Sequence, residues 1–375
     1  MTENLIKLRH HIHQHPELSG VEFETADLLK SKLETLNPDE IITGIGGCGV
    51  AAKFTSSEDG PTILFRAELD ALPIEEINDF SYRSVNKGVS HKCGHDGHMS
   101  IIFGLAEKIA KNRPQKGSVV ILFQPAEETG EGGRFVVADQ KFKDLETDYC
   151  YALHNLPGHP MGQVMIRTGT FNCASRGMII KLSGKTAHAA YPETGISPAQ
   201  ALSELLAAFP NIADTIDMDE LLMSTTVHSS MGECAFGTAP SDAVFMVTLR
   251  SESNEGMAKL VEKSEELVKK AAQKHSLSHS IEWADVFDAS VNHEECVEHV
   301  AKAAQKTNHD VAYLDEPFRW SEDFGAISAS ASGAMFAFGA GEENPQIHNP
   351  DYDFPDELIE RGVSIFYQIY SDHLL

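Results

Sequence analysis

Three histidines, one cysteine and one aspartate fall within eight consecutive residues of the chain. This segment reads His91-Lys92-Cys93-Gly94-His95-Asp96-Gly97-His98. Zinc-like ions prefer thiolate and neutral imidazole ligands, and the glycines allow tight turns that direct neighbouring side chains to one centre. A polar surface loop could have the same composition, but other ligand-type residues recur downstream. The segment is therefore a candidate metal-binding loop.

Further ligand-type residues follow segments whose composition predicts buried strands. Apolar runs predict strands at residues 62–66, 118–123, 148–153 and 334–338. The polar residues that come after these runs are Asp70, Glu127, Glu128, His154 and His348. In open α/β sheets the functional site lies beyond the carboxyl ends of the strands. We therefore expect these residues to converge in one cleft.

The number of ligand-type residues indicates more than one metal ion. Five of them are expected at this cleft, namely Cys93, His95, Glu128, His154 and His348. That set exceeds the needs of one tetrahedral zinc ion. It suits two divalent ions that share a water, an arrangement that lowers the pKa of the water and polarises a carbonyl. Thiolate and imidazole favour zinc, but carboxylate and imidazole also accept manganese, cobalt or nickel.

Three other residues are candidates for catalysis. Glu127 is next to Glu128, and neighbouring side chains point in different directions in extended backbone, so Glu127 can stay free as a general base. Asp70 follows a buried strand and would orient a ligand histidine, or else cap a helix or form a salt bridge. His188 would bind an oxyanion only if its segment closes over the cleft. The alternatives are two solvated glutamates and a structural histidine.

The order of predicted elements divides the chain into two domains. Strands alternate with helices in residues 1–174 and 291–375, which predicts an α/β catalytic domain with a mostly parallel central sheet. Residues 175–290 predict an inserted α+β domain with an antiparallel sheet on one side. The helices expected from apolar periodicity lie at 3–15, 25–36, 99–110, 197–213, 254–274 and 356–371. Asn254 is an expected N-cap, and Asn292 with Glu295 is an expected capping box.

Composition disfavours several classes of function. The formal net charge is −26, from 30 basic and 56 acidic residues, which argues against nucleic acid and anionic membranes as partners. No apolar run is long enough to span a membrane, and the N-terminus does not resemble a signal peptide. Six scattered cysteines do not form a disulfide pattern. We therefore expect a cytoplasmic protein in which Cys93 is reduced and available to a metal.

Taken together, these residues resemble the M20 metallopeptidase family. Within it they are similar to the amidohydrolase branch of hippurate hydrolases, N-acyl-amino-acid deacylases, N-acetyl-diaminopimelate deacetylases and plant auxin-conjugate hydrolases. The resemblance covers nearly the whole chain, and its motifs are specific as an ordered set. They are Leu8-Arg9, His13-Gln14-His15-Pro16-Glu17-Leu18, Arg66-Ala67-Glu68-Leu69-Asp70-Ala71-Leu72-Pro73, Cys93-Gly94-His95-Asp96-Gly97-His98, Pro125-Ala126-Glu127-Glu128, Ala152-Leu153-His154-Asn155, Gly184-Lys185-Thr186-Ala187-His188-Ala189-Ala190-Tyr191-Pro192, Ser321-Glu322-Asp323-Phe324 and His348-Asn349-Pro350.

The resemblance implies a two-domain enzyme in which an inserted lid domain closes over a site with two metal ions. The reaction that it implies is hydrolysis of an N-acyl amino acid to a carboxylic acid and a free amino acid. Because the lid domain of this family often mediates dimerisation, a homodimer is expected. The implied roles are Glu127 as general base, His188 as a contact of the substrate carbonyl or oxyanion, and Cys93, His95, Glu128, His154 and His348 as metal ligands.

Several positions depart from the family pattern or qualify it. Glu68 stands where an aspartate is usual, and Lys92 stands where an alanine is common. In the lid, Gly237-Thr238-Ala239-Pro240 replaces an Asn-Val-Ile-Pro segment whose asparagine contacts the substrate in relatives. Arg250 matches a family arginine and is a candidate partner for the substrate carboxylate. A salt bridge on an edge strand would explain Arg250 equally well.

Two other functions remain open from the sequence. A dipeptidase or aminopeptidase could use the same site, but it needs a pocket for a free α-amino group, and no residue is assigned to that pocket. A non-catalytic metal-binding protein with a degraded site is the other alternative, suggested only by the altered segment at 237–240.

Overall fold

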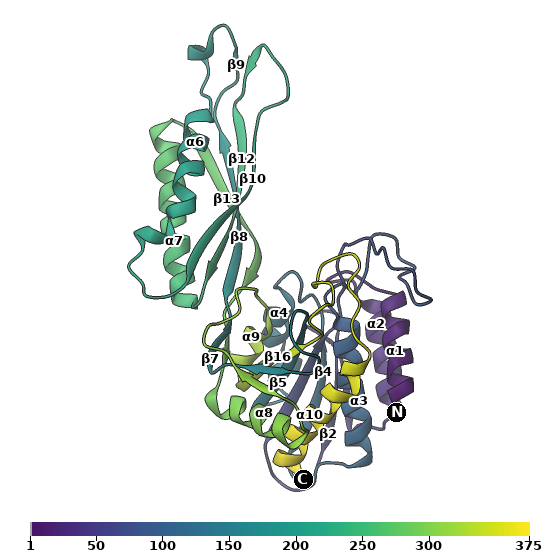
Figure 1. Cartoon of the computed structure of the whole chain (residues 1–375). Helices are drawn as coiled ribbons and strands as arrows, with labels where there is room; N and C mark the ends of the chain where they lie inside the picture. Colours follow the sequence, from purple (N-terminus) through teal and green to yellow (C-terminus); the bar gives the residue numbers. More distant parts are fainter. Residues whose placement is uncertain (1) are drawn as a thin grey trace. The chain divides into compact units, whose positions relative to one another are not determined.

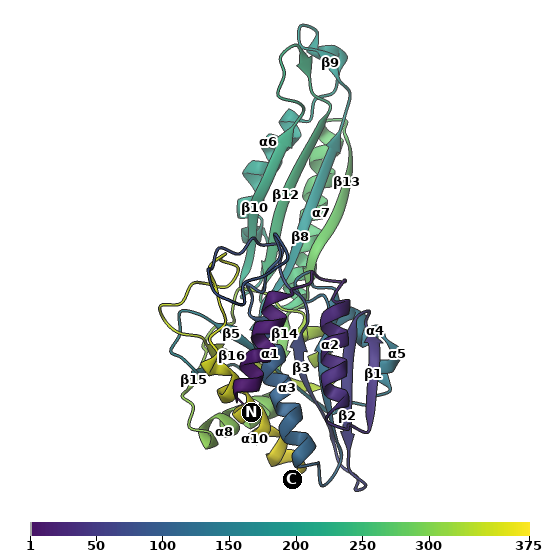
Figure 2. The ribbon, with the colours of Figure 1, turned by 90° about the vertical axis from the view of Figure 1, so that its right-hand side faces the viewer.

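The computed structural model describes residues 2–375, and Figures 1 and 2 show its ribbon. The chain divides into two compact units. The first extends to Phe171 and resumes at Ser290–Pro317 and Glu322–Leu375, and the second consists of Asn172–Ala289 and Phe318–Ser321. The sequence prediction set the insert at 175–290 and did not foresee that residues 318–321 return to the second unit.

A mixed eight-stranded sheet forms the centre of the first unit, as described within residues 2–375. The inner strands β4, β3, β5 and β16 are parallel, whereas β2 is antiparallel to β4 and β6 is antiparallel to β16. The prediction of a mostly parallel central sheet is therefore confirmed, and the antiparallel pairs lie toward the margins. There β1 and β2 form a hairpin around Gly46 and Gly47, and a hairpin makes its strands antiparallel. The strand order is β1 (Glu40–Ile45), β2 (Gly49–Thr55), β4 (Ser118–Gln124), β3 (Thr62–Glu68), β5 (Tyr149–Leu156), β16 (Ser332–Gly339), β6 (Val164–Ile166) and β15 (Val311–Tyr313).

Helices pack on this sheet, which explains why β4 is buried along its whole length. The predicted helix at 99–110 begins four residues earlier, at His95, so two motif histidines lie in the first turns of α3 instead of a loop. α10 packs against α3 and α8 and lies beside them in both views (Figures 1 and 2). The helices that share one apolar core with the sheet are α1 (Thr2–Gln14), α2 (Phe23–Glu34), α3 (His95–Lys111), α8 (Glu294–Lys306) and α10 (Glu357–Leu374). Shorter elements are α4 (Gly132–Ala138), α5 (Gln140–Lys143), α9 (Phe324–Ser328), β7 (Gly169–Asn172) and β14 (Ser290–Asn292).

The second unit is an antiparallel sheet with two helices, in agreement with the predicted α+β insert. Its core receives buried side chains from α6 (Ala199–Ala208) and α7 (Asn254–Lys274). The helix predicted to reach residue 213 ends at Ala208, because Pro210 lacks the N–H that would continue it. The turns η2 (Phe209–Asn211) and η3 (Ala213–Thr215) follow, and η1 (Pro192–Thr194) precedes α6. The strand order is β10 (Leu222–Met231), β12 (Asp242–Ser251), β8 (Ala174–Ser183) and β13 (Ser278–Phe287), with β9 (Ala187–His188) and β11 (Thr238–Ala239) as a separate ladder.

Two helix caps differ from the prediction. Ser253, not Asn254, caps α7, because its hydroxyl accepts a backbone N–H of the first turn at 2.9 Å. The Asn254 side chain instead accepts a backbone N–H from outside the helix. At α8 the capping box of Asn292 and Glu295 is not formed, because the Asn292 side chain bonds the backbone of Met335. Both asparagine side chains therefore bond backbone groups outside the helices that they were expected to cap.

Two expectations from composition can be compared with the structure. Within residues 2–375, no helix is both long and apolar enough to cross a membrane. Within the described residues no disulfide joins the six cysteines, and the thiol of Cys93 is buried.

His13 is a buried histidine of the histidine-rich helix α1. Its Nδ1 lies 2.9 Å from a carboxylate oxygen of Asp96, and its Nε2 lies 3.0 Å from one of Glu76. Burial alone would lower the pKa of His13, but the hydrogen bonds to Asp96 and Glu76 raise it to about 9. A doubly bonded imidazolium therefore ties α1 to the first turn of α3 and to the loop after β3.

Folding stability should depend on pH through His13. Because its pKa is higher in the folded chain than the ordinary value of about 6.5, its stabilising contribution is complete below about pH 6.5 and is lost as pH rises through about 9. Replacing His13 by glutamine should lower the free energy of unfolding by about 3 kcal/mol in the acidic range. Denaturant unfolding across this pH range, with the exposed His11→Gln as control, checks the expectation. A loss that does not shrink as pH rises would contradict it.

Candidate metal centre

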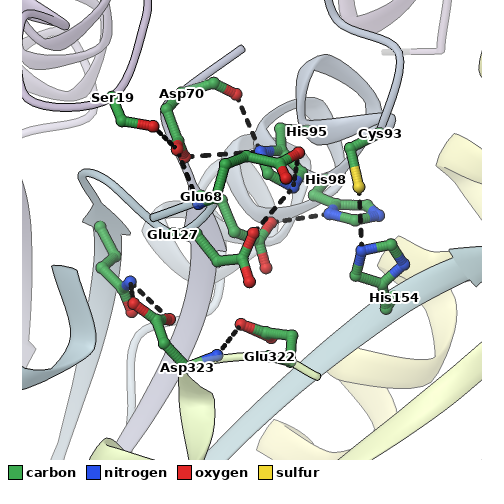
Figure 3. A network of polar contacts seen from close by, with 12 residues as sticks. Ser19, Glu68, Asp70, Cys93, His95, His98, Glu127, His154, Glu322 and Asp323 are labelled. Carbon is green, nitrogen blue, oxygen red and sulfur yellow. Dashed lines mark hydrogen bonds and ion pairs between the residues drawn. The ribbon is translucent and has the colours of Figure 1, made fainter. Parts of the chain in front are cut away.

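Residues from the carboxyl ends of the inner strands meet in the first unit, as Figure 3 shows. β3 ends at Glu68 and is followed by Asp70, and Glu127 comes shortly after the end of β4. His154 lies near the end of β5, and the N-terminus of α3 brings His95 to the same place. Residues from four separate parts of the chain are thus held by the ends of rigid elements.

Several trios of side chains at this place are spaced closely enough to hold a metal ion. In each trio the ligand atoms lie within 4.8 Å of one another. The structure brings together all five ligands that the sequence suggested, and Cys93 and His95 each belong to more than one trio. The trios are Cys93 with His95 and His154, Cys93 with Glu128 and His348, His95 with Glu127 and Glu128, Glu68 with His95 and His98, and Glu127 with Glu322 and Asp323.

Backbone carbonyl groups fix the orientation of two imidazoles. His95 Nδ1 donates to the carbonyl of Asp70, and His154 Nδ1 donates to the carbonyl of Asn155, each at 2.8 Å. A carbonyl oxygen only accepts, so each ring carries a proton on Nδ1 and turns its Nε2 to the centre. The Nε2 of His154 lies 3.3 Å from Cys93 Sγ. This is the arrangement in which ligand histidines are usually held by outer partners.

Three buried atoms at the centre have no hydrogen-bond partner among the described residues. They are His95 Nε2, Glu128 Oε1 and Asp70 Oδ1. Leaving a buried polar atom unpaired costs about 1–3 kcal/mol, and a bound cation would supply the missing partner. Thiol, imidazole and carboxylate together are the donor set of zinc and related divalent ions. The residues present therefore fit divalent cations bound among them.

The pKa values at the centre also favour positive charge there. Burial opposes the charge of His95, but a hydrogen bond to Asp70 and the charges of nearby carboxylates, Glu68 first among them, raise its pKa to about 10. Burial raises the pKa of Glu128 to about 7, although the charge of His95 opposes the rise. Burial likewise raises the pKa of the Cys93 thiol well above its usual range. A divalent cation competes with these protons, so its affinity should rise with pH.

Glu127 and Glu128 share His95 as a neighbour but differ in their other contacts. Glu127 Oε2 lies 3.7 Å and Glu128 Oε1 lies 3.9 Å from His95 Nε2. Glu128 Oε2 also lies 3.7 Å from His348 Nε2. Glu127 also lies beside Glu322. Burial, followed by the charges of Glu322 and Glu128, raises the pKa of Glu127 well above its usual range. Glu127 is therefore a carboxyl group disposed to hold a proton.

Asp70 contacts two parts of the centre. Its Oδ2 accepts the hydroxyl of Ser19 at 2.7 Å and the backbone N–H of Glu128 at 2.9 Å, and its Oδ1 lies 3.5 Å from His95 Nδ1. Burial alone would raise the pKa of Asp70, but its ion pair with His95 lowers it. These contacts favour the orienting role suggested by the sequence over a helix cap.

Sequence reasoning assigned no role to His98 and Glu68, which lie at the centre as a pair. His98 Nδ1 donates to Glu68 Oε2 at 2.7 Å, and its Nε2 accepts the backbone N–H of Asn155 at 3.2 Å. Both ring nitrogens of His98 are thus engaged by the protein. Both residues could be noticed in the sequence, because His98 is the last residue of the candidate metal-binding motif and Glu68 stands at a position where aspartate was expected. Nothing in the sequence indicated that the two side chains contact each other.

A second feature without an assigned role is the buried guanidinium of Arg66. It donates to Gln124 at 2.9 Å and to Glu322 at 2.9 and 3.0 Å, and it also pairs with Asp323 at 2.6 Å and with Glu68. Arg66 therefore offsets part of the negative charge that surrounds Glu127. The segment with Glu322 and Asp323 was recognised only as a motif, because nothing local in it indicates a partner far away in the sequence.

Lys92 is buried and joins separate loops of the first unit. Its Nζ donates to the Asn78 side chain at 3.0 Å, donates to the Tyr352 carbonyl at 2.8 Å, and pairs with Glu76. Its own carbonyl accepts the backbone N–H of His348 at 2.7 Å. Lys92, a departure from the expected family pattern, is thus connected to a candidate ligand.

The remaining two predicted site residues, His188 and Arg250, lie in the second unit. His188 is exposed in β9, pairs in register with Thr238 of β11, and accepts the N–H of Ala190 on its Nδ1 at 3.1 Å. The altered segment at 237–240 therefore runs directly beside His188. Arg250 donates to Ser321 Oγ at 3.0 Å and to a backbone carbonyl at 2.6 Å. Its strand, β12, is an inner strand between β10 and β8, so the edge-strand alternative is wrong.

Residues 64–372 match the sequence model of peptidase family M20/M25/M40. The chain belongs to this family. N-acetyl-L-cysteine deacetylase of Bacillus subtilis is 30% identical over 374 residues, covering 98% of this chain and 88% of that protein. Hippurate hydrolase of Campylobacter jejuni is 29% identical over 371 residues, covering 98% and 96%. The crystal structure of the Bacillus subtilis YXEP protein, described as a dinuclear metal binding peptidase from the M20 family, aligns with a TM-score of 0.82 at 24% identity, covering 98% and 97%.

The family match and the hydrolytic relatives identify the protein as an M20-type, metal-binding amidohydrolase that acts on a small molecule. The resemblance inferred from the sequence motifs is thereby confirmed. The likeness to the YXEP structure concerns the fold.

Proposed function

We propose that this amidohydrolase cleaves the amide bond of N-acyl amino acids and releases a carboxylic acid and a free amino acid. The observation that carries the proposal is the convergence of five candidate ligands around a buried glutamate, Glu127, that itself faces the centre. The names of two relatives, a hippurate hydrolase and an N-acetyl-L-cysteine deacetylase, both denote substrates of this class.

The proposed cofactor is a pair of divalent cations, with zinc, manganese, cobalt or nickel as candidates. When bound, the pair supplies a water of lowered pKa and an electrophile for the substrate carbonyl. The unpaired Nε2 of His95 and Oε1 of Glu128 support binding there. The residues proposed to hold the cations are Cys93, His95, Glu128, His154 and His348.

In the proposed reaction Glu127 carries the proton. Its carboxylate accepts a proton from the attacking water as the water oxygen bonds to the carbonyl carbon. It then gives that proton to the nitrogen as the C–N bond breaks, and the amine leaves. Its raised pKa supports this role, because a base that also returns the proton works best with a pKa near the operating pH.

Three further residues are proposed to assist. Asp70 keeps His95 and the Glu128 segment in place through the contacts described above. His188 is proposed to donate to the oxyanion, and Arg250 to pair with the substrate carboxylate. Because Ser321 and a backbone carbonyl already accept from Arg250, a substrate carboxylate would have to replace or share those contacts.

The proposed preference for acylated substrates is based on the contacts of the acidic residues near Glu127. An aminopeptidase needs an acidic group for the free α-amino group of its substrate. The two acids beside Glu127, Glu322 and Asp323, are bonded to Arg66. Their engagement favours an acylated substrate over a dipeptide.

The test is a hydrolysis screen of protein reconstituted separately with zinc, manganese, cobalt and nickel. The substrates are N-acetyl, N-benzoyl and longer N-acyl amino acids, each paired with an unblocked dipeptide of the same C-terminal residue, and released amine is measured. Turnover of the acylated series is expected. Preference for the dipeptides would replace this proposal by a peptidase function, and no turnover with metal bound would indicate a binding protein.

A homodimer through the second unit is a further proposal, supported only by the family resemblance. The molecular mass in solution tests it, and a monomeric mass at micromolar concentration would contradict it. The cytoplasmic location and the lack of nucleic-acid and membrane partners stay predictions from composition.

A further inference from the structure

The backbone immediately before Glu127 is in a conformation that side chains resist. Ala126 has a φ of 53°, in the left-handed region, where the β-carbon of an L-residue approaches the following carbonyl oxygen. The turn Pro125–Glu128 therefore needs outside contacts to keep this shape. Its shape matters, because it sets the directions of Glu127 and Glu128.

A buried carboxylate supplies one of these contacts. Glu22 has no exposed surface, and its Oε1 accepts the N–H of Ala126 at 2.8 Å and that of Gly20 at 2.9 Å. Glu22 directly precedes α2, so the first turn of that helix anchors it. The other Glu22 oxygen, Oε2, is buried without a hydrogen-bond partner among the described residues. Removing a carboxylate from water costs free energy, so the burial of Glu22 indicates that its contacts have a role in the structure.

The turn is held on both sides of Glu127. Glu22 accepts the amide of the residue before it, and Asp70 accepts the amide of Glu128 after it at 2.9 Å. The carbonyl of Ala126 accepts the N–H of Gly132 at 3.0 Å, which closes the turn on itself. Of these contacts, only the one from Glu22 acts on the amide of the left-handed residue.

We propose that Glu22 is a positioning residue, which holds Ala126 in the left-handed conformation and thereby directs Glu127 toward the metal centre. The inference rests on the proposed function of Glu127. Without Glu22, the backbone at Ala126 relaxes toward a negative φ, and rotation there swings the Glu127 side chain away from His95. Displacements of about 1 Å in a reacting group can reduce turnover by about a hundredfold.

The proposal predicts how substitutions at Glu22 and Ala126 change kcat, both alone and in combination. Glu22→Ala should reduce kcat by about tenfold to a hundredfold with little change in KM. Glu22→Gln keeps an oxygen acceptor and should stay within about threefold of the unmodified protein. Ala126→Gly in the Glu22→Ala background should recover about fivefold, because glycine adopts a positive φ without steric cost. Ala126→Gly alone should change kcat little.

Glu17→Ala is the matched control. Glu17 lies in the same N-terminal loop, and its carboxylate also binds backbone amides, those of Glu24 and Thr25. It does not bond the Pro125–Glu128 turn. Glu17→Ala should therefore lower kcat much less than Glu22→Ala does, even where it lowers the melting temperature. If Glu22→Ala fails to fold, Glu22→Asp, which is one methylene shorter, replaces it.

Amide hydrogen exchange gives a readout that needs no turnover. In Glu22→Ala the peptide that contains Ala126 and Glu128 should exchange faster than in the Glu17→Ala control. Unchanged exchange, or absence of rescue by Ala126→Gly, would overturn the proposal. If the exchange result holds but no acylated substrate is turned over by any of the proteins, the proposed function fails and the positioning role of Glu22 stands.

Discussion

Replacing Glu127 by glutamine should reduce kcat by about 10²–10⁴-fold, because an amide of nearly the same shape cannot accept and return a proton. KM and metal content should change little, since Glu127 is not among the five proposed ligands. Steady-state rates on the best N-acyl amino acid, with metal content measured on the same samples, check this. Glu131→Gln, an exposed glutamate a few residues further on, is the matched control. Full activity in Glu127→Gln with metals bound would remove Glu127 from the mechanism.

The same variant should not lose stability. Burial and neighbouring carboxylates raise the pKa of Glu127 in the folded chain, so its ionised form opposes folding once pH exceeds the ordinary glutamate pKa. Glutamine does not ionise, so the variant avoids the free-energy cost of a buried negative charge at this position. Metal-free Glu127→Gln should therefore melt no lower than the unmodified protein at neutral pH, and the difference in its favour should grow with pH. A large loss of stability would mean that a disturbed fold explains the lost activity.

Removing divalent cations should abolish hydrolysis and lower the melting temperature. Acidic side chains that include Glu68, Asp70, Glu127 and Glu128 crowd the centre, and without cations their mutual repulsion acts against folding. Ligand binding at about a hundred times the dissociation constant stabilises a fold by about 2.7 kcal/mol, so a shift of several degrees is expected. A chelator already saturated with zinc is the control, and added metal should restore both quantities.

The stability difference between metal-loaded and metal-free protein should also increase with pH. His95, with a pKa of about 10, and Glu128, with one of about 7, must give up protons before they can bind a cation. Metal affinity therefore rises as protons become scarcer. Thermal unfolding at a series of pH values measures the difference. Hydrolysis that persists after metal content falls far below one ion per chain would contradict a metal-dependent mechanism.

Features that depend on local composition could be predicted from the sequence. The inner strands could be read from apolar runs, because strands buried on both faces have no polar positions. The residues after those strands met as expected, because parallel strands place their carboxyl ends along one edge. The strands β6 and β15 were missed, since three residues are too few to show a period.

Features that depend on long-range partners could not be predicted. His13 looks like its neighbours in a histidine-rich helix, and only the fold shows that Asp96 and Glu76 bond its ring. Arg66 and Glu322 are 256 positions apart, and no local pattern joins them. Asn254 resembles a cap by type and position, yet Ser253 one residue earlier serves the helix. In each case a tertiary contact decides between local options of similar energy.

Lys92 has a consequence for how this chain could evolve. Its ammonium group holds Glu76 and the Tyr352 carbonyl in a buried place, and its backbone accepts the amide of His348. Replacing Lys92 by alanine would remove one of the two buried cations that contact Glu76, the other being the imidazolium of His13. Alanine at this position would therefore be tolerated only with compensating changes elsewhere. Lys92 is in this sense entrenched, and consensus design that treats the position as independent would weaken this protein.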